Sequence, residues 1–384
     1  MPDIINTPET KNPPTALLEQ GSDYFETQGK RPTMEDALAI LHDFSEQERQ
    51  AILQMNPIEL GHRLWTAHRI INEDTLDKKF VDGSTASTTL FDGKANLITA
   101  TLADASSFVA IYDTSQQLRA VYRLNSVTHT FKNPKEVQRV TGMGGTVFNH
   151  RFWGNLAVSR ALGDHHMNDL VKRDCICGDS QIDVVNLPDL YRQLHIPESE
   201  VGTVKIISCC DGFTDGAGKY RQTKIGHEAF LKRCLKSKNS SLSLSEYLVQ
   251  KALKHHSSDN VSVAVQTIVE DGVMREKPVV VAIYDGHCGA LTASYAACNI
   301  GQIVRQLFLL SPKEYTQHPQ SVYQQKASYL RDHPNEGRLL SDNVLEDVTT
   351  LEKPSLGTLG LFGKQQESCN LGCASVSENS TPIP

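Results

Sequence analysis

The stretch Val279–Gly289 constrains the fold of this chain most strongly, because it joins a strand to a polar turn. Residues 279–284 read VVVAIY, an apolar run rich in β-branched side chains. Such a run predicts a strand covered on both faces, which needs no polar alternation. Asp285-Gly286 ends the run and turns the chain, so Asp285 and His287 would lie at the tip of a rigid element. A strand followed by an ordinary solvated turn is the alternative for this stretch alone.

The composition is that of a globular protein without nucleic-acid-binding character. Of the 384 residues, 39% are hydrophobic and 22% charged, and the formal net charge is -7. A nucleic-acid-binding protein usually carries a basic face. No apolar run is long enough to span a bilayer, and residues 1–15 lack the apolar core of a secretory signal. We expect a cytoplasmic monomer with no membrane span and no nucleic-acid partner.

The nine cysteines indicate reduced thiols, because their number is odd and several lie inside apolar runs. Two close pairs, Cys175/Cys177 and Cys209/Cys210, invite comparison with zinc ligands. Neither pair has the two-residue gap of usual zinc sites, so zinc is disfavoured.

Hydrophobic patterns along the chain predict an α+β protein. The strands are expected at Ala37–Phe44, Ser87–Phe91, Ala95–Leu102, Phe108–Tyr112, Gln117–Tyr122, Val204–Cys210, Val261–Val269 and Val279–Tyr284. Helices are expected within Glu46–Glu73, with Ser45 as N-cap, and at Ile225–Lys236, Ser243–His255 and Leu291–Leu310. Lys172–Gln193 reads as irregular. The domain plan is a flexible lead over 1–20, a main domain over 21–311, a helical extension over 312–353 and a disordered tail over 354–384.

Acidic residues recur where the predicted strands begin or end. They are Glu35 and Asp36 before a strand, Asp104 after one, Asp211 and Asp285 at strand ends, and Asp259 before a strand. Carboxylate oxygens without clustered His or Cys suit Mg²⁺ or Mn²⁺. Two such ions about 3.5–4 Å apart can activate water and hold phosphate oxygens.

Six motifs resemble the signature of the metal-dependent protein phosphatases, the PPM type or protein phosphatase 2C family. They are RPTMED, GSTA, LAVSRALGD, DGFTD, SDNVSVAV and YDGHCG, spread over Arg31–Gly289. The resemblance implies an α-β-β-α sandwich of two antiparallel sheets flanked by helices, with the site at one end between the sheets. It also implies a serine/threonine phosphatase that acts on phosphoserine and phosphothreonine proteins and uses two Mn²⁺ or Mg²⁺ ions, with a weaker third.

The resemblance assigns metal-binding roles residue by residue. Asp285 would bridge two metals, with Glu35 and the Gly286 carbonyl completing one site. Asp211 and Asp259 would hold the other metal. Asp104 matches a third-metal position, although Ala103-Asp104-Ala105-Ser106 stands where the family usually has Gly-Asp-Ser-Arg.

Catalytic roles follow from the same resemblance. A metal-bridging hydroxide would attack phosphorus, and Asp36 would orient bound water. Arg31 matches the arginine that grips the phosphate, and His287 matches the general acid that protonates the leaving oxygen.

Other motif residues have structural interpretations. Asp164 is expected to stabilise its loop, and Arg160 to form an internal ion pair. Asp215 is open between supporting a metal ligand and capping its own turn. His165 and His166 read as exposed loop histidines. Cys288 stands where the family usually has glycine, so its Cβ would restrict the loop; oxidant sensitivity of this thiol is a hypothesis.

The order of the motifs differs from that of the family. There the DGH strand normally follows the MED strand, whereas here it follows SDNVSVAV. Val261–Val269 would lead away from the site and Val279–Tyr284 would return, and strands of similar length span similar distances. We therefore predict a permuted strand order around a conventional site, with Asp285 close to Asp211.

Two other functions and one other location remain as alternatives. A pseudophosphatase would bind phosphoproteins or partners without turnover, although the complete set of acidic residues favours catalysis. A metal-dependent nuclease would share the carboxylates, but it would not explain LAVSRALGD and no basic stripe supports it. A secreted bacterial effector acting in host cytoplasm is the alternative for the localisation.

Overall fold

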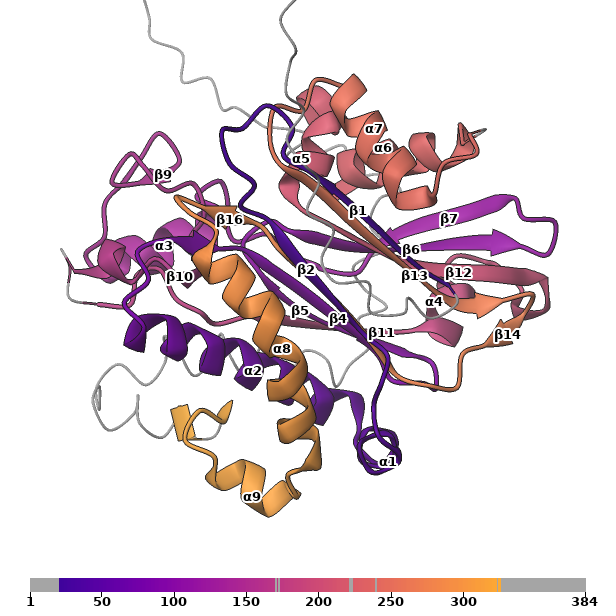
Figure 1. Ribbon diagram of the computed structural model, residues 1–384, viewed down its shortest axis with the longest axis horizontal. Coiled ribbons are helices and arrows are strands. Elements are labelled where there is room, and N and C mark those ends of the chain that lie inside the picture. The colour runs from indigo at the N-terminus through magenta and orange to yellow at the C-terminus, as the bar shows by residue number, and fades with distance from the viewer. Residues whose placement is uncertain are drawn as a thin grey trace, which may run out of the picture.

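Two antiparallel sheets stack face to face between two layers of helices (Figure 1). The computed structural model describes residues 21–325, apart from positions 170, 172, 221–223, 239 and 323. This layering confirms the expected α-β-β-α sandwich. The predicted tail over 354–384, most of the 312–353 extension and the lead over 1–20 lie outside the described residues.

The first sheet has the order β1-β13-β12-β6-β7, with β14 added to β13. Its strands are β1 (Ser22–Thr27), β6 (Ser106–Asp113), β7 (Leu118–Arg123), β12 (Val201–Cys209), β13 (Val261–Glu270) and β14 (Val273–Met274). The second sheet has the order β11-β5-β4-β15-β2. Its strands are β2 (Ala37–Leu41), β4 (Ala86–Phe91), β5 (Asn96–Leu102), β11 (Gln181–Asn186) and β15 (Val279–Tyr284).

Strand β15 occupies the bounds that its apolar run predicts, and all six of its residues are buried. It pairs antiparallel with β2 on one side and β4 on the other. The chain thus leaves the first sheet through β13 and β14 and enters the second sheet as β15. That this strand order is permuted relative to that of the family stays a prediction.

Helices cover both outer faces of the sandwich (Figure 1). On the second sheet lie α2 (Pro57–Asp77) and α8 (Leu291–Leu309), with α1 (Glu46–Gln54) against α8 and α9 (Pro312–Gln317) against α2. On the first sheet lie α5 (Asp211–Thr214), α6 (Lys224–Lys236) and α7 (Leu244–Lys254). Capping boxes begin α1 at Ser45 and α2 at Asn56, because each cap is followed three residues later by glutamate. None of the described helices is both long and apolar enough to cross a membrane.

Three apolar layers hold the sandwich together. The middle layer packs the two sheets through residues such as Ile111, Ile206 and Ile283. Outer layers join the second sheet to α2 and α8, and the first sheet to α6 and α7. Burial of this apolar surface is the main stabilising contribution to such a fold.

A segment between β7 and β11 packs on its own small core beside one end of the sandwich. It contains α3 (Pro134–Gly142), β8 (Val147–Phe148), β9 (Arg151–Phe152), β10 (Leu162–Gly163) and the 3₁₀ turn η1 (His165–Asn168). Strand β10 joins β3 (Gly83–Ser84) and β16 (Gly286–His287) in a three-stranded sheet. This small sheet ties the segment to the polar turn after β15.

The prediction of irregular structure over Lys172–Gln193 is wrong in its second half. Gln181–Asn186 forms edge strand β11 on β5, and α4 (Leu187–Gln193) follows it with Asn186 as N-cap. Strand β1 was also not expected. Both strands are mostly half-buried, which weakens the local pattern, and pairing with β5 and β13 supplies what the local sequence lacks. The remaining 3₁₀ turns are η2 (Glu198–Glu200) and η3 (Asp215–Tyr220).

Candidate active site

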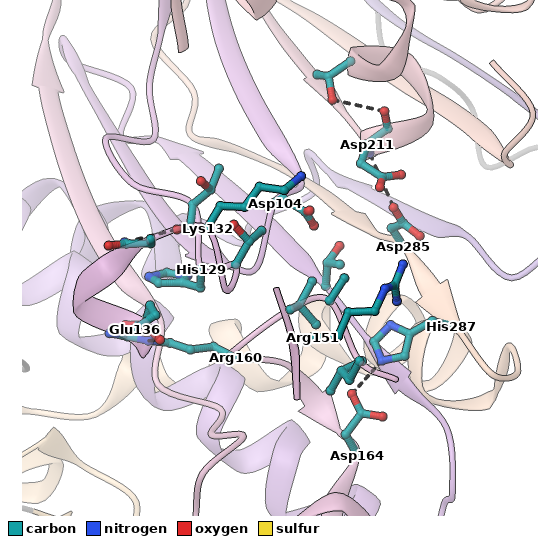
Figure 2. Close-up of a pocket in the computed structure, with 18 of the residues that line it drawn as sticks. Asp104, His129, Lys132, Glu136, Arg151, Arg160, Asp164, Asp211, Asp285 and His287 are labelled. Atoms are coloured by element: carbon teal, nitrogen blue, oxygen red, sulfur yellow. Dashed lines mark hydrogen bonds and ion pairs between the residues drawn. The ribbon is translucent and has the colours of Figure 1, made fainter. Parts of the chain in front are cut away.

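The predicted site residues gather at one end of the sandwich. The pocket there is lined by Arg31, Glu35, Asp104, Asp211, Asp259, Asp285, Gly286 and His287, and Asp36 is buried next to Asp285. Strands β12 and β15 end at this pocket and β13 begins there, so Asp211, Asp285 and Asp259 lie at the same end of the sandwich. Figure 2 shows Asp211, Asp285 and His287 on one side of the pocket and His129 and Lys132 on the other, with Asp104 beside Lys132.

Asp285 lies at the centre of the carboxylate cluster. The backbone N–H of Asp211 faces Asp285 Oδ2 at 3.4 Å, so these two residues lie as close as predicted. Among the described residues, Asp36, Cys210 and Asp285 each offer an atom within 4.8 Å of the others. Asp36 Oδ2 accepts a hydrogen bond from Ser262 at 2.7 Å, whereas its buried Oδ1 has no hydrogen-bond partner among these described residues.

Crowding of buried carboxyl groups makes this cluster electrostatically unfavourable without a cation. Burial and the charges of Asp211 and Asp36 raise the pKa of Asp285 well above its usual range. Burial and neighbouring aspartates do the same for the pKa of Asp211. Burial, assisted by the charge of Asp259, raises the pKa of Asp36 to about 6. Oxygen donors of this kind fit a hard divalent cation, and one of them, Asp36 Oδ1, has no hydrogen-bond partner among residues that the structure describes.

The loop that carries Arg31 and Glu35 is held by the strand start at Asn260. The Asn260 side chain accepts from the Glu35 N–H at 2.8 Å and donates to the carbonyls of Gln28 and Thr33. Arg31 Nη2 donates to Asp259 Oδ2 at 2.6 Å while its side chain stays 53% exposed. The guanidinium is therefore oriented at the pocket rim and accessible to an anion.

Gly286 and Glu35 approach each other closely. A Cβ at Gly286 would lie 2.3 Å from the Glu35 carbonyl oxygen, so only glycine fits there. The Glu35 carboxylate accepts a hydrogen bond from Thr33 Oγ1 at 2.9 Å. Glu35 thus lies at the pocket wall, outside the tight group of Asp36, Cys210 and Asp285.

His287 is held by Asp164. His287 Nε2 lies 2.6 Å from Asp164 Oδ2, and only 2% of the Asp164 side chain is exposed. Burial alone would lower the pKa of His287, but the hydrogen bond and charge of Asp164 outweigh it and raise the pKa. The loop-stabilising role predicted for Asp164 did not include this contact with His287.

Asp104 belongs to the same electrostatic cluster despite its altered motif. Burial raises its pKa, the charge of His287 opposes that rise, and Asp215 adds to it. Asp104 in turn contributes to the raised pKa of Asp211. The third-metal role of Asp104 stays a prediction.

Arg160 forms the internal ion pair that was predicted. Its Nη2 lies 2.7 Å from Glu136 Oε1, and both residues are buried. Glu136 also accepts hydrogen bonds from Arg139 and Ser159. His165 is not an exposed loop residue as expected, because it contacts Thr75 Oγ1 and the Asn72 carbonyl, whereas His166 is exposed.

Cys288 adopts the left-handed conformation that glycine favours, with φ 61°. The loop therefore keeps a backbone shape suited to glycine and places the cysteine at the pocket rim. Partial burial and the charges of Asp164 and Glu35 raise the pKa of the thiol. A raised pKa reduces the reactive thiolate fraction, which argues against strong oxidant sensitivity. All seven described cysteines are free thiols.

Asp82 supports the site without lining the pocket, and its role was not predicted from the sequence. It accepts from the backbone N–H groups of Leu291 and Thr292 and from the Thr292 hydroxyl. Because Ala290 at the N-cap offers no side-chain cap, Asp82 caps α8 from a distant segment. This contact fixes the chain that follows His287. No local pattern around Asp82 indicates the role, since its partners lie more than 200 residues away.

The family model for protein phosphatase 2C matches residues 67–261, about half of the chain. The chain belongs to the protein phosphatase 2C family. The match includes Asp104, Asp211 and Asp259, and it leaves Glu35 and Asp285 outside.

Relatives in this family share modest identity with the chain. The probable protein phosphatase 2C 22 of Arabidopsis thaliana is 27% identical over 243 residues, covering 63% of this chain and 57% of the relative. Protein phosphatase 1B of Homo sapiens is 30% identical over 135 residues, covering 35% of this chain and 25% of the relative. The chain thus spans less than two thirds of these relatives' length. A phosphatase structure from Toxoplasma gondii aligns with a TM-score of 0.44 at 15% identity, covering 68% of this chain and 96% of that one.

Proposed function

We propose that the protein is a divalent-metal-dependent serine/threonine phosphoprotein phosphatase that hydrolyses phosphomonoesters. The observation that carries this proposal is the buried cluster of Asp36, Asp211 and Asp285, in which burial and the charges of neighbouring aspartates raise each pKa. Family membership supports phosphate chemistry at this cluster. We also propose that the protein acts as a cytoplasmic monomer on phosphoprotein partners.

Each residue of the site has a distinct task in this reaction. Asp36, Asp211, Asp259, Asp285, Glu35 and the Gly286 carbonyl would hold two Mn²⁺ or Mg²⁺ ions, with Asp104 available for a third. The bound ions would supply water activation and neutralisation of phosphate charge. Arg31 would bind phosphate oxygens through its exposed guanidinium. Asp36 Oδ1 has no hydrogen-bond partner in the part of the chain that the structure describes, and it would accept a hydrogen bond from the attacking water. His287 would give a proton to the departing Ser or Thr oxygen.

Phosphate release from a phosphothreonine peptide tests this function directly. Wild type should require Mn²⁺ or Mg²⁺ and lose activity in chelator. Asp285→Asn should lower turnover at least about 100-fold, because even changes next to metal ligands cost 10–100-fold. Asp189→Asn is the matched control, since this aspartate is exposed on α4 and pairs only locally with Arg192.

Metal binding is measured separately from turnover on the same protein preparation. Calorimetric titration with Mg²⁺ measures whether the cluster binds metal, independently of hydrolysis. A folded wild-type protein that binds metal and phosphopeptide but releases no phosphate would establish the pseudophosphatase alternative. Equal activity of Asp285→Asn and Asp189→Asn would refute the assigned site.

A further inference from the structure

The contact between Asp164 and His287 is built by three separate segments of the chain. Strand β3 pairs with β10 on one side and with β16 on the other. Gly83 on β3 faces both Gly163, which precedes Asp164, and His287. The backbone N–H of Asp164 also donates to the Asp82 carbonyl at 3.1 Å. The small sheet therefore fixes both partners before their side chains meet.

The space over Gly83 is filled by the pair itself. A Cβ at Gly83 would lie 2.2 Å from Asp164 Oδ2 and 2.5 Å from His287 Nε2. Any side chain there would push the carboxylate and the imidazole apart. Asp164 has φ 53°, a left-handed conformation that aspartate tolerates better than most residues. The backbone at Gly83 and at Asp164 therefore accommodates the contact between Asp164 and His287.

We propose that Asp164 is the positioning residue of His287, fixing Nε2–H so that Nδ1 serves the leaving oxygen. A buried carboxylate that accepts from one ring nitrogen selects the imidazole tautomer and orients the ring. This inference rests on the proposed phosphatase function. It adds which nitrogen reacts and which residue makes that nitrogen available.

His287 supplies the proton that the leaving oxygen needs. Water adds its oxygen to phosphorus and releases one proton to solvent. As the bond from phosphorus to the substrate Oγ breaks, its electron pair stays on Oγ, which takes the proton from His287 Nδ1. The imidazole is left neutral with Nε2–H on Asp164, and Nδ1 then regains a proton from solvent.

A series of leaving groups distinguishes positioning from a merely structural role. The departing oxygen of a phosphothreonine peptide needs a proton, whereas 2,4-dinitrophenolate does not. Asp164→Asn should lower kcat for the peptide about 100-fold, at the low end of general acid catalysis, with KM unchanged. It should leave hydrolysis of 2,4-dinitrophenyl phosphate nearly unchanged. Asp169→Asn, an exposed aspartate on the same loop, should behave as wild type. Equal losses on both substrates would overturn the proposal.

Two further tests address the geometry of the pair and the coupling between Asp164 and His287. Gly83→Ala should show the same dependence on leaving group, because it separates Asp164 from His287. In His287→Gln, adding Asp164→Asn should cause no further loss, since residues that act together are non-additive. Additive losses in the double variant would mean that Asp164 acts elsewhere.

The ¹⁵N chemical shifts of the histidine ring provide a readout without turnover. In the Mg²⁺-loaded protein, at a pH high enough to deprotonate the ring, the signal that His287→Gln removes should report neutral imidazole with the proton on Nε2. Asp164→Asn should shift that signal toward the other tautomer, and an unchanged signal would refute the inference. If wild type shows no hydrolysis, the proposed function fails while this measurement still decides the pairing.

Discussion

Glu136 should be among the most destabilising positions to neutralise, although it touches no reacting atom. Glu136 is 4% exposed, and its carboxylate accepts hydrogen bonds from Arg160, Arg139 and Ser159. In Glu136→Gln, the buried guanidinium of Arg160 and the partly buried guanidinium of Arg139 would face a neutral amide. Removing one partner of a buried ion pair typically costs about 3–5 kcal/mol of unfolding free energy. That is a large share of the roughly 5–15 kcal/mol available to a folded domain.

Urea unfolding followed by tryptophan fluorescence measures this loss. Glu200→Gln is the control, because its partner Arg119 is partly exposed and the pair is worth about 0.2–1 kcal/mol. The change for Glu136→Gln should appear as a lower midpoint with an unchanged slope. A difference no larger than that of Glu200→Gln would refute the reasoning.

The pH dependence provides a second check on Glu136. Burial alone would raise its pKa, but the charges of Arg160 and Arg139 outweigh burial and lower the pKa below 4.5. The ionised group therefore stabilises the fold fully above about pH 4.5, and this contribution is lost as the pH falls further. The stability difference between wild type and Glu136→Gln should shrink below that pH. A constant difference down to the acid limit would contradict the assignment.

Other changes have equally definite outcomes. Tyr315→Phe should cost about 0.5–1.5 kcal/mol in urea unfolding, because it removes the buried hydroxyl that donates to the His62 carbonyl and contacts Thr66 Oγ1. Asp285→Asn should raise the melting temperature of metal-free protein by relieving repulsion, and should abolish the increase that Mn²⁺ gives wild type. Burial lowers the pKa of His68 to about 3, so stability should fall as the pH drops below about 6.5, less so in His68→Gln. Cys288→Gly should stabilise the protein by about 1 kcal/mol in thermal unfolding, because it removes a left-handed non-glycine residue.

Sequence patterns predicted the elements with strong local signals. The apolar run of β15 and the periodicity of α8 gave bounds within one residue of those observed. The half-buried strand β11 was missed, because its stability comes from pairing with β5 rather than from its own residues.

The site was predictable to the extent that motifs carry it. The carboxylates at strand ends were identified, and the structure brings them to one pocket. The contacts made by Asp82 and Asp164 were not foreseen, because they depend on two-residue strands that have no hydrophobic period of their own. Only the three-dimensional pairing of β3, β10 and β16 shows that Asp164 supports His287.

The late position of β15 in the chain couples assembly of the site to completion of the fold. Strand β15 lies between β2 and β4. Because neighbouring strands lie about 4.8 Å apart, a gap of roughly 10 Å separates β2 from β4 until β15 is in place. Asp36 precedes β2 and Asp285 follows β15, so their carboxylates meet only when that gap is filled. Pairings so distant in sequence form late in folding. Metal binding at this cluster should therefore report the complete second sheet, and partly folded chains should bind no ion there.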